Sequence, residues 1–246
     1  MKIVISQPML FPWVGMLEQI RLADIYVNYT DVQFSKGSFV NRVQIKTPRG
    51  PRWMTVPLGN QRLGQRIDQV GINDRQPWRE EHLALLAEAH RGAPYRDDML
   101  DLVSGVYSRD YSDLGSIATA SLRALSGYFG IDGDRRFVGI GELGIEGSGS
   151  ARVLAIVRAL GGTTYITGHG AANYLDHDAF DRAGIAVEYM VYAKTPYPQL
   201  HGEFTPYVSS LDLVANAGPG GVEYIRPRTT PWKDFPTHER YRALSG

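Results

Sequence analysis

The stretch Ala151–Thr167, ARVLAIVRALGGTTYIT, contains a helix, a glycine stop and a strand in direct succession. Apolar residues have helical spacing up to Leu160, and the residues after the two glycines are mostly β-branched or aromatic. A strand precedes this unit from Phe137, and another follows over Ile185–Met190. Strands that alternate with helices usually pair in parallel. The sequence therefore predicts an α/β fold whose C-terminal part has βα alternation.

The residues before Phe137 add short strands and then a run of helices. Lys2–Ser6 and Asp24–Tyr29 are typical of strands, and Val14–Leu22 between them is typical of a short helix. A hairpin over 43–56 and a strand over Ile67–Ile72 are expected next. Helical spacing of apolar residues then covers three segments, 78–90, 96–108 and 114–129.

We expect a single domain over residues 1–246, built on a mixed sheet with a central helical segment. Its parts are an N-terminal strand and loop part (1–75), the helical segment (76–130), an α/β part (135–218) and an extended tail (219–246). Within the α/β part, a capped helix over Ser210–Asn216 is expected to end at Gly218.

Composition excludes several classes of function. Lys and Arg number 26, as do Asp and Glu, so the formal net charge is zero and nucleic acid is not expected as a partner. No apolar run reaches the roughly 20 residues of a membrane span, and the apolar N-terminus is too short for a signal peptide. We therefore expect a cytoplasmic protein without a membrane partner. The absence of cysteine excludes thiolate catalysis and zinc–sulfur sites.

The segment Gly139–Gly144, GIGELG, matches the spacing of a dinucleotide-binding glycine loop. In such a loop the helix opens at the third glycine, so that its amides face the pyrophosphate. Here the helix is expected to begin near Ser150, after another glycine turn, and no acidic residue ends the next strand. We therefore expect no dinucleotide site.

Two of the six histidines, His169 and His201, lie in glycine-containing loops after strands. In Thr164–Asp176, TYITGHGAANYLD, glycines flank His169 on both sides and leave room for a substrate to approach the ring. Imidazole titrates near neutral pH, so both residues are candidates for proton transfer, although a lone histidine is more often structural. No histidine spacing typical of a metal site is present, so no metal is expected.

Candidate binding side chains gather in four further segments, which are Ser6–Gln19, Asp31–Arg42, Gly147–Arg152 and Pro196–Gly218. The loop Asp31–Arg42 has five polar groups beside two phenylalanines, which favours a binding wall over a solvated loop. Ser148 or Ser150 can cap the following helix, or the free helix amides together with Arg152 can attract an anion. Asp212 either complements a helix dipole or orients a histidine. The candidates in these segments are Gln7, Trp13, Asp31, Gln33, Lys36, Asn41, Arg42, Ser148, Arg152, Tyr197, Gln199 and Asp212.

Several unusual motifs together resemble the WbqC-like family, in the same order and from about Ile3 to Gly218. They are SQPMLFPWVGMLEQIRLADIYVNYTDVQFSKGSFVNR, WMTVPL, TTYITGHGAANYLD and YPQLHGEFTPYVSSLDLVANAG. On the family's characteristic positions fall Gln7, Pro8, Pro12, Trp13, Asp31, Gln33, Asn41, Arg42, Tyr197, Gln199 and Asp212. His169 departs from the pattern, because proline or another residue is expected there in many relatives.

The resemblance implies an enzyme of O-antigen or natural-product assembly. Within the family, the chain resembles the amide-forming condensing enzymes of lincosamide antibiotic biosynthesis. The function expected from this resemblance is acyl transfer from a carrier-protein phosphopantetheine thioester to the amine of an amino sugar. The phosphopantetheine belongs to the carrier protein, so no cofactor bound to this chain is expected. The alternatives are N-acyl transfer onto a nucleotide-linked amino sugar, and a non-catalytic module that docks a carrier protein.

For this reaction, we assign His169 as the base, Asp31 or Asp212 as the carboxylate that fixes its tautomer, and His201 as a reserve base. Substrate contacts are assigned to Gln7, Trp13, Gln33, Asn41, Tyr197 and Gln199. Contacts with phosphopantetheine or with the carrier protein are assigned to Lys36, Arg42, Ser148 and Arg152.

Overall fold

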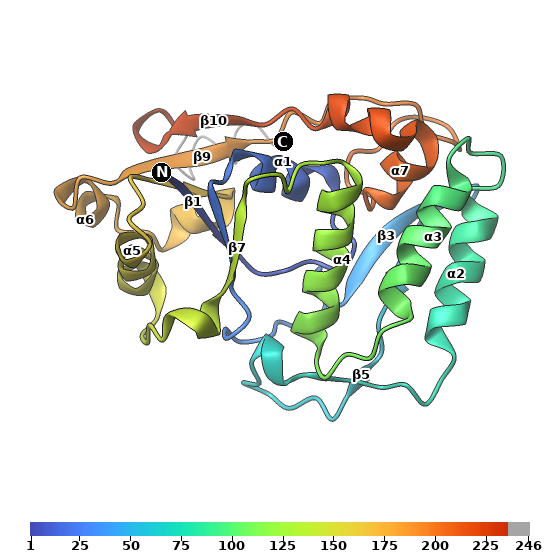
Figure 1. Cartoon of the computed structure of the whole chain (residues 1–246), viewed down its shortest axis with the longest axis horizontal. Coiled ribbons are helices and arrows are strands. Elements are labelled where there is room, and N and C mark those ends of the chain that lie inside the picture. Colours follow the sequence, from blue (N-terminus) through green and yellow to red (C-terminus); the bar gives the residue numbers. More distant parts are fainter. Residues whose placement is uncertain (236–246) are drawn as a thin grey trace.

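The computed structural model describes residues 1–235 and contains a six-stranded sheet in the order β10-β9-β8-β1-β2-β7 (Figure 1). The five strands other than β10 run parallel, and β10 pairs with β9 antiparallel. The strands are β1 (Lys2–Ser6), β2 (Ile25–Asn28), β7 (Arg136–Gly139), β8 (Thr164–Thr167), β9 (Ala186–Val191) and β10 (Arg228–Pro231). The predicted α/β class with a mixed sheet is therefore confirmed.

The strand order places a topological switch point at the centre of the sheet. From β1 the chain adds β2 and β7 on one side, and it then crosses to add β8, β9 and β10 on the other. This is the strand order of dinucleotide-binding α/β folds, in which ligands bind where the order reverses. Here the connection after β1 holds Gln7 and Pro8 in place of a glycine-rich turn. Ligand chemistry is thus expected between the carboxyl ends of β1 and β8.

Two separate cores cover the two faces of the sheet, because successive strand residues point to opposite sides. Val4, Tyr26 and Ile166 pack on one face beneath α1 (Val14–Leu22) and α4 (Leu114–Tyr128). Ile3, Val27 and Tyr165 pack on the other face beneath α5 (Gly149–Ala159) and α6 (His177–Arg182). The loops that leave β1 and β8 therefore turn to opposite faces and leave the switch point between them.

The long connection between β2 and β7 holds the central helical segment. It begins with a hairpin of β3 (Arg42–Thr47) and β4 (Gly50–Thr55), and a short pair of β5 (Leu58–Gly59) and β6 (Gly71–Ile72) follows. Next come α2 (Trp78–Ala89) and α3 (Arg96–Tyr107), which precede α4. These helices lie beside the sheet, together with α7 (Leu211–Ala217), as Figure 1 shows.

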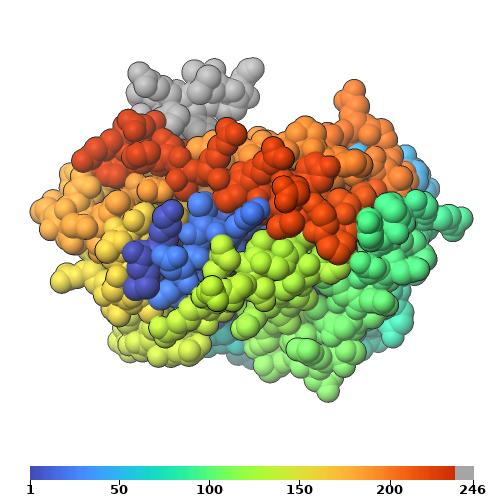
Figure 2. Space-filling model, turned by 45° about the horizontal axis from the view of Figure 1, so that its top comes forward, coloured from blue at the N-terminus to red at the C-terminus, as the bar shows by residue number. Residues whose placement is uncertain are grey.

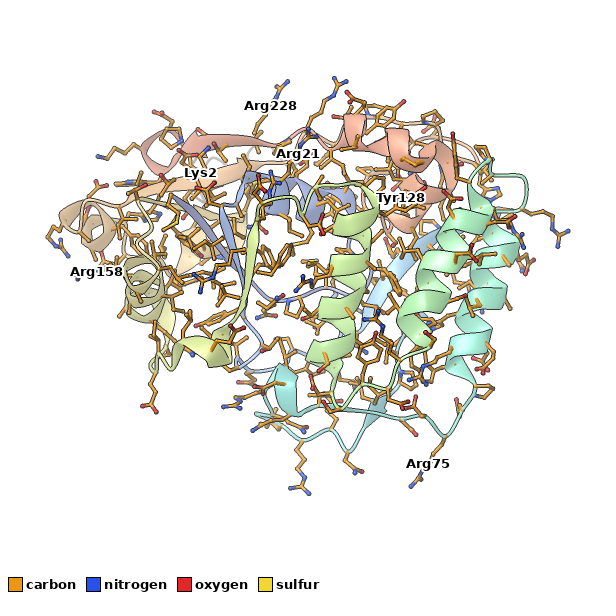
Figure 3. All side chains as sticks on the ribbon, viewed as in Figure 1. Lys2, Arg21, Arg75, Tyr128, Arg158 and Arg228 are labelled. Carbon is orange, nitrogen blue, oxygen red and sulfur yellow. The ribbon has the colours of Figure 1, made fainter. Side chains whose placement is uncertain are left out.

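The C-terminal segment crosses back over the N-terminal helix. Figure 2 shows it, in red, beside the blue N-terminal residues. Arg21, labelled in Figure 3, donates from Nη1 to the carbonyl oxygens of Val222 at 3.1 Å and Ile225 at 2.6 Å. Glu18 is buried beneath the same segment. Residues near the two ends of the chain are therefore parts of one packed layer.

Two expected elements differ from the structure. Ile67–Ile72 is not one strand: Ile67–Gln69 forms a turn of 3₁₀ helix and only Gly71–Ile72 is extended. Ile67 and Val70 are both fully buried, and a separation of three residues places them on one side of a helical turn. The expected extended tail contains β10, and its residues 236–246 lie outside the described residues. No helix within residues 1–235 is long and apolar enough to cross a bilayer.

Candidate active site at the carboxyl edge of the sheet

The switch point is bordered by Gln7 after β1 and by His169 after β8. Gln7 is exposed, and His169 is half-buried as the first residue of a 3₁₀ turn over His169–Asn173. The Tyr29 amide donates to the Ser6 carbonyl oxygen at 2.9 Å, which holds the end of β2 against the end of β1. The sheet therefore presents residues from the N-terminal third and from the C-terminal third of the chain at one edge.

An aromatic row joins the N-terminal proline loop to His169. The ring of Tyr192 lies 4.8 Å from Trp13 and 5.1 Å from His169, measured between centroids. Tyr207 lies 5.8 Å from Trp13 on the other side. The Trp13 ring sits directly on Gly15, where a Cβ atom would come within 2.3 Å of the indole. The indole therefore needs a glycine at this position in order to reach Tyr192.

The backbone fixes the tautomer of His169. Its Nε2 lies 2.7 Å from the carbonyl oxygen of Met190 in β9. A carbonyl oxygen can only accept, so Nε2 carries the hydrogen and the lone pair of the neutral ring is on Nδ1. The Met190 carbonyl thus performs the orienting task that the sequence analysis gave to a carboxylate.

Asp31 is paired with Arg152 and is not the partner of Nε2 of His169. Both of its oxygens accept from the guanidinium, with 3.0 Å between Nη1 and Oδ1. Nη1 also lies 3.3 Å from the hydroxyl of Tyr29, and Nε donates to the Ile145 carbonyl oxygen at 2.9 Å. The side chain of Arg152 is only 8% exposed, so a neutralising carboxylate is needed beside it. Asp31 therefore neutralises Arg152, and this corrects its assignment as the carboxylate that orients His169.

Arg152 and Asp31 form one wall of a pocket of about 420 Å³ at the N-terminus of α5. Gln33, Ser148 and Tyr174 also line it. Ser148 stands in the N-cap position, yet its side chain makes no capping hydrogen bond. Ser150 bonds elsewhere, because its Oγ accepts from the Asp176 amide at 2.8 Å. Neither serine therefore caps α5 with its side chain. Gln33, Ser148 and Arg152 line one pocket.

A second polar cluster lies apart from His169, between α2 and α7. Asp212 Oδ1 is 3.4 Å from Nε2 of His90, and both side chains are almost fully buried. His90 Nδ1 donates to the Leu86 carbonyl oxygen at 3.1 Å, and His201 Nε2 donates to that of Ala89 at 2.6 Å. Asp212 and His201 therefore belong to the junction of these helices, which corrects the assignment of Asp212 as the carboxylate beside His169. The assignment of His201 as a reserve base stays a prediction.

Three of the expected substrate contacts take part in internal hydrogen bonds. Gln199 donates from Nε2 to the Tyr197 hydroxyl at 2.9 Å and accepts from Lys46 Nζ at 3.0 Å. Burial raises the pKa of Tyr197, and the Asp212 carboxylate raises it further. Asn41 is buried at the base of the hairpin, where its Nδ2 donates to the Val56 carbonyl oxygen at 3.2 Å. Asn41 and Tyr197 are thus buried among internal hydrogen bonds, and their assignment to substrate contacts stays a prediction.

The four residues assigned to phosphopantetheine or the carrier protein occupy two places. Ser148 and Arg152 line the pocket at α5, whereas Lys36 and Arg42 lie at the base of the β3–β4 hairpin. Arg42 donates from Nε to the Gly37 carbonyl oxygen at 2.9 Å, and its guanidinium lies 4.2 Å from the centre of the Trp53 ring. Two of the four residues therefore line the pocket at α5, and the other two lie near the hairpin.

Sequence reasoning missed Tyr192 as part of this edge, and the structure adds the burial of Glu18. Tyr192 directly follows β9, and that position beside a strand end was its only signal. Glu18 interrupts the apolar stripe of α1, is 1% exposed, and accepts from the amides of Ala193 at 3.4 Å and Arg226 at 3.3 Å. Burial raises the pKa of Glu18 to about 7. In the part of the chain that the structure describes, acidic and histidine side chains form no group of three able to hold a metal.

Comparisons with known proteins agree with the motifs. The family model described as WbqC-like protein family matches residues 7–224. The uncharacterized protein Rv1507c of Mycobacterium tuberculosis is 29% identical over 228 residues, which cover 92% of this chain and 97% of that protein. No solved structure matches the chain. The family match covers most of the sequence, and the chain therefore belongs to the WbqC-like protein family.

Proposed function

We propose that this protein forms an amide by transferring an acyl group from a carrier-bound phosphopantetheine thioester to the amine of an amino sugar. The observation that carries the proposal is the hydrogen bond between His169 and the Met190 carbonyl oxygen at the switch point of the sheet. That bond commits Nε2 as a donor and leaves Nδ1 as the basic nitrogen of a neutral imidazole. Such a ring is suited to accept a proton from an attacking nucleophile.

The reaction requires a neutral amine. An alkylammonium with a pKa near 10.4 is only about one part in a few thousand neutral at pH 7. Nδ1 of His169 removes a proton as the amine nitrogen bonds to the thioester carbonyl carbon. The carbon–sulfur bond then breaks, and the same proton is returned to the departing thiolate. A positioned base of this kind accelerates reactions by about 10²–10⁴-fold.

Direct attack is the simplest route, because the chain has no cysteine to carry the acyl group. The tetrahedral oxyanion then needs a donor, and the exposed side-chain amide of Gln7 after β1 is our candidate. Trp13 and Tyr192 offer aromatic faces beside the imidazole, against which the apolar face of a sugar ring can pack. Holding both reactants at one strand edge also lowers the entropic part of the barrier.

A second candidate is N-acyl transfer onto a nucleotide-linked amino sugar. The pocket of about 420 Å³ at α5 favours it, because this pocket contains the start of α5, whose backbone amides have no side-chain cap. Titrating the protein with a nucleotide sugar, and separately with an acyl carrier protein, distinguishes the candidates. Saturable binding of the nucleotide sugar alone would favour the second.

The reaction class is tested by intact-mass analysis of acyl carrier proteins incubated with this protein and a pool of amino sugars. We expect the acyl mass to leave the carrier and an amide to form, and both changes to stop in His169→Ala. A third hypothesis, a non-catalytic docking module, makes the opposite prediction. It requires that a variant changed at His169, Asp31 and Asp212 together still supports product formation in a reconstituted system.

A further inference from the structure

Although the formal net charge of the chain is zero, its positive and negative residues are unevenly distributed along the sequence. The segment Val32–Ile67 contains seven Lys and Arg residues and no Asp or Glu. The other 210 residues contain 19 basic and 26 acidic residues, a net charge of −7. The segment comprises the loop after β2, the β3–β4 hairpin and the loop after β5. A stretch of 36 residues therefore carries a net charge of +7, which balances the net charge of −7 on the rest of the chain.

Most of these cations face solvent. Lys46 is the buried one, and its Nζ donates to Gln199 Oε1 at 3.0 Å and to the Glu203 carbonyl oxygen at 2.6 Å. The exposed ones are Lys36, Arg49, Arg52, Arg62 and Arg66. Arg66 lies 3.0 Å from Asp68, which is just outside the segment. The exposed charges form a positive field around the hairpin, which extends about one Debye length into solution.

Of the three large apolar side chains exposed in this segment, Phe39 and Trp53 lie side by side, and Leu63 lies in the loop after β5. Phe39 is 42% exposed and Trp53 is 40% exposed, with 5.9 Å between their ring centroids. In the hairpin, Gln44 pairs with Trp53 and Arg42 pairs with Thr55, so Arg42, Gln44 and Trp53 point to the same side. We call Phe39, Arg42, Gln44 and Trp53 the hairpin face. An exposed aromatic pair bordered by arginine has the composition of a protein interface centre.

The hairpin face adjoins the candidate active site through the backbone. The Gln44 carbonyl oxygen accepts from the Ser209 amide at 2.9 Å, and Ser209 in turn bridges to Trp13. The Leu10 amide donates to the Phe39 carbonyl oxygen at 3.0 Å, which ties the proline loop to the same surface. Trp13 continues to Tyr192 and His169 in the aromatic row. A protein bound to the hairpin therefore lies next to the switch-point edge.

We propose that the hairpin face docks the acidic surface of a partner protein, and, resting on the proposed function, that this partner is the acyl-bearing carrier protein. The positive field attracts an acidic surface and speeds encounter, while Phe39 and Trp53 supply apolar contact. A nucleic acid fits this surface less well. Arg42 lies over the Trp53 ring at 4.2 Å and occupies a face on which a base would stack.

The test measures binding of a holo acyl carrier protein with an acidic helical surface, by calorimetry at about 20 mM and about 500 mM salt. Lys36→Glu with Arg42→Glu should weaken binding at least tenfold at low salt and much less at high salt. Trp53→Ala should weaken it at least tenfold at both. The matched control is Arg158→Glu with Arg182→Glu, which changes the charge equally on α5 and α6; Arg158 is labelled in Figure 3. It should change the affinity less than twofold.

The docking proposal would be overturned if the hairpin charge reversal and the control charge reversal weakened carrier binding equally, or if the carrier protein did not bind at all. Tighter binding of a 20-base-pair duplex DNA that the same hairpin substitutions abolish would also overturn it. Turnover with free acyl-pantetheine separates this proposal from the proposed function. If no donor gives an amide but the carrier still binds through the hairpin, the function fails and docking stands. If amide forms and the hairpin variants bind the carrier like wild type, docking fails and the function stands.

Discussion

Met190 and His169 meet across the ends of β9 and β8, where the Met190 carbonyl oxygen lies 2.7 Å from His169 Nε2. A backbone carbonyl in a paired strand cannot rotate away as a side chain can, and it does not ionise. It therefore fixes the tautomer of the imidazole more rigidly than a side-chain carboxylate on a loop. The proposed base, His169, is therefore oriented by the sheet itself.

Two substitutions of His169 distinguish its proposed role as a base from its hydrogen bond to the Met190 carbonyl oxygen. His169→Ala should lower the rate of amide formation at least about a hundredfold, because it removes the proposed base. His169→Gln should lower it similarly, although a glutamine amide can still donate to the Met190 carbonyl oxygen. Circular dichroism should show both variants folded like wild type. A His169→Ala protein that makes amide at nearly the wild-type rate would remove this residue from the mechanism.

Breaking the pair of Arg152 and Asp31 should destabilise the fold. Arg152→Met leaves the carboxylate of Asp31 unpaired in a poorly solvated site, which we expect to cost about 3 kcal/mol in the free energy of unfolding. Changing Asp31 to Leu in the same chain should restore much of this loss, because no buried charge then remains. The control is Arg182→Met, whose 4.0 Å pair with Asp176 is largely exposed and should matter by less than about 0.5 kcal/mol. Urea denaturation measures all three, and equal effects at the two sites would contradict the buried pair.

Glu18 should make the fold less stable as the pH rises from about 4.5 to 7. Burial raises its pKa from 4.5 to about 7, so in this range the folded state keeps a proton that the unfolded chain has lost. The stabilisation is complete below the unfolded pKa and is lost by the time the pH passes the folded pKa. It amounts to roughly 3 kcal/mol. The difference in unfolding free energy between wild type and Glu18→Gln should follow this curve. A difference that is constant from pH 5 to pH 8 would show that Glu18 does not titrate as described.

His82 should have the opposite effect at acidic pH. Burial lowers its pKa from 6.5 to about 4. Its Nε2 donates to the Thr55 carbonyl oxygen at 3.2 Å, and Nδ1 accepts from the Tyr107 hydroxyl at 2.8 Å. Between these two pKa values the unfolded chain binds a proton that the folded state excludes, so stability falls as the pH falls. The full loss is roughly 3 kcal/mol. Chemical denaturation at pH 7 and pH 4.5 should show a smaller loss in His82→Gln; an equal loss in both proteins would assign the acid sensitivity elsewhere.

Local periodicity determined most of the secondary structure. Helix α1 lies at the predicted Val14–Leu22, and α2 ends one residue before the predicted boundary. The expectation that the helix after GIGELG begins near Ser150 also rested on local spacing, and α5 begins at Gly149. These predictions succeed because backbone hydrogen bonds and side-chain period act within a few residues.

The partners of the ionisable groups were decided only by the tertiary structure. Asp31 and Arg152 are 121 residues apart in sequence, and Asp212 lies beside His90 because α7 packs near the end of α2. The sequence placed His169 at a strand end, but the strand order that brings it to the side of Gln7 comes from the crossing of the chain after β7. Which charges meet depends on how whole elements pack to bury apolar surface, and that is a sum over the entire chain with no local signature.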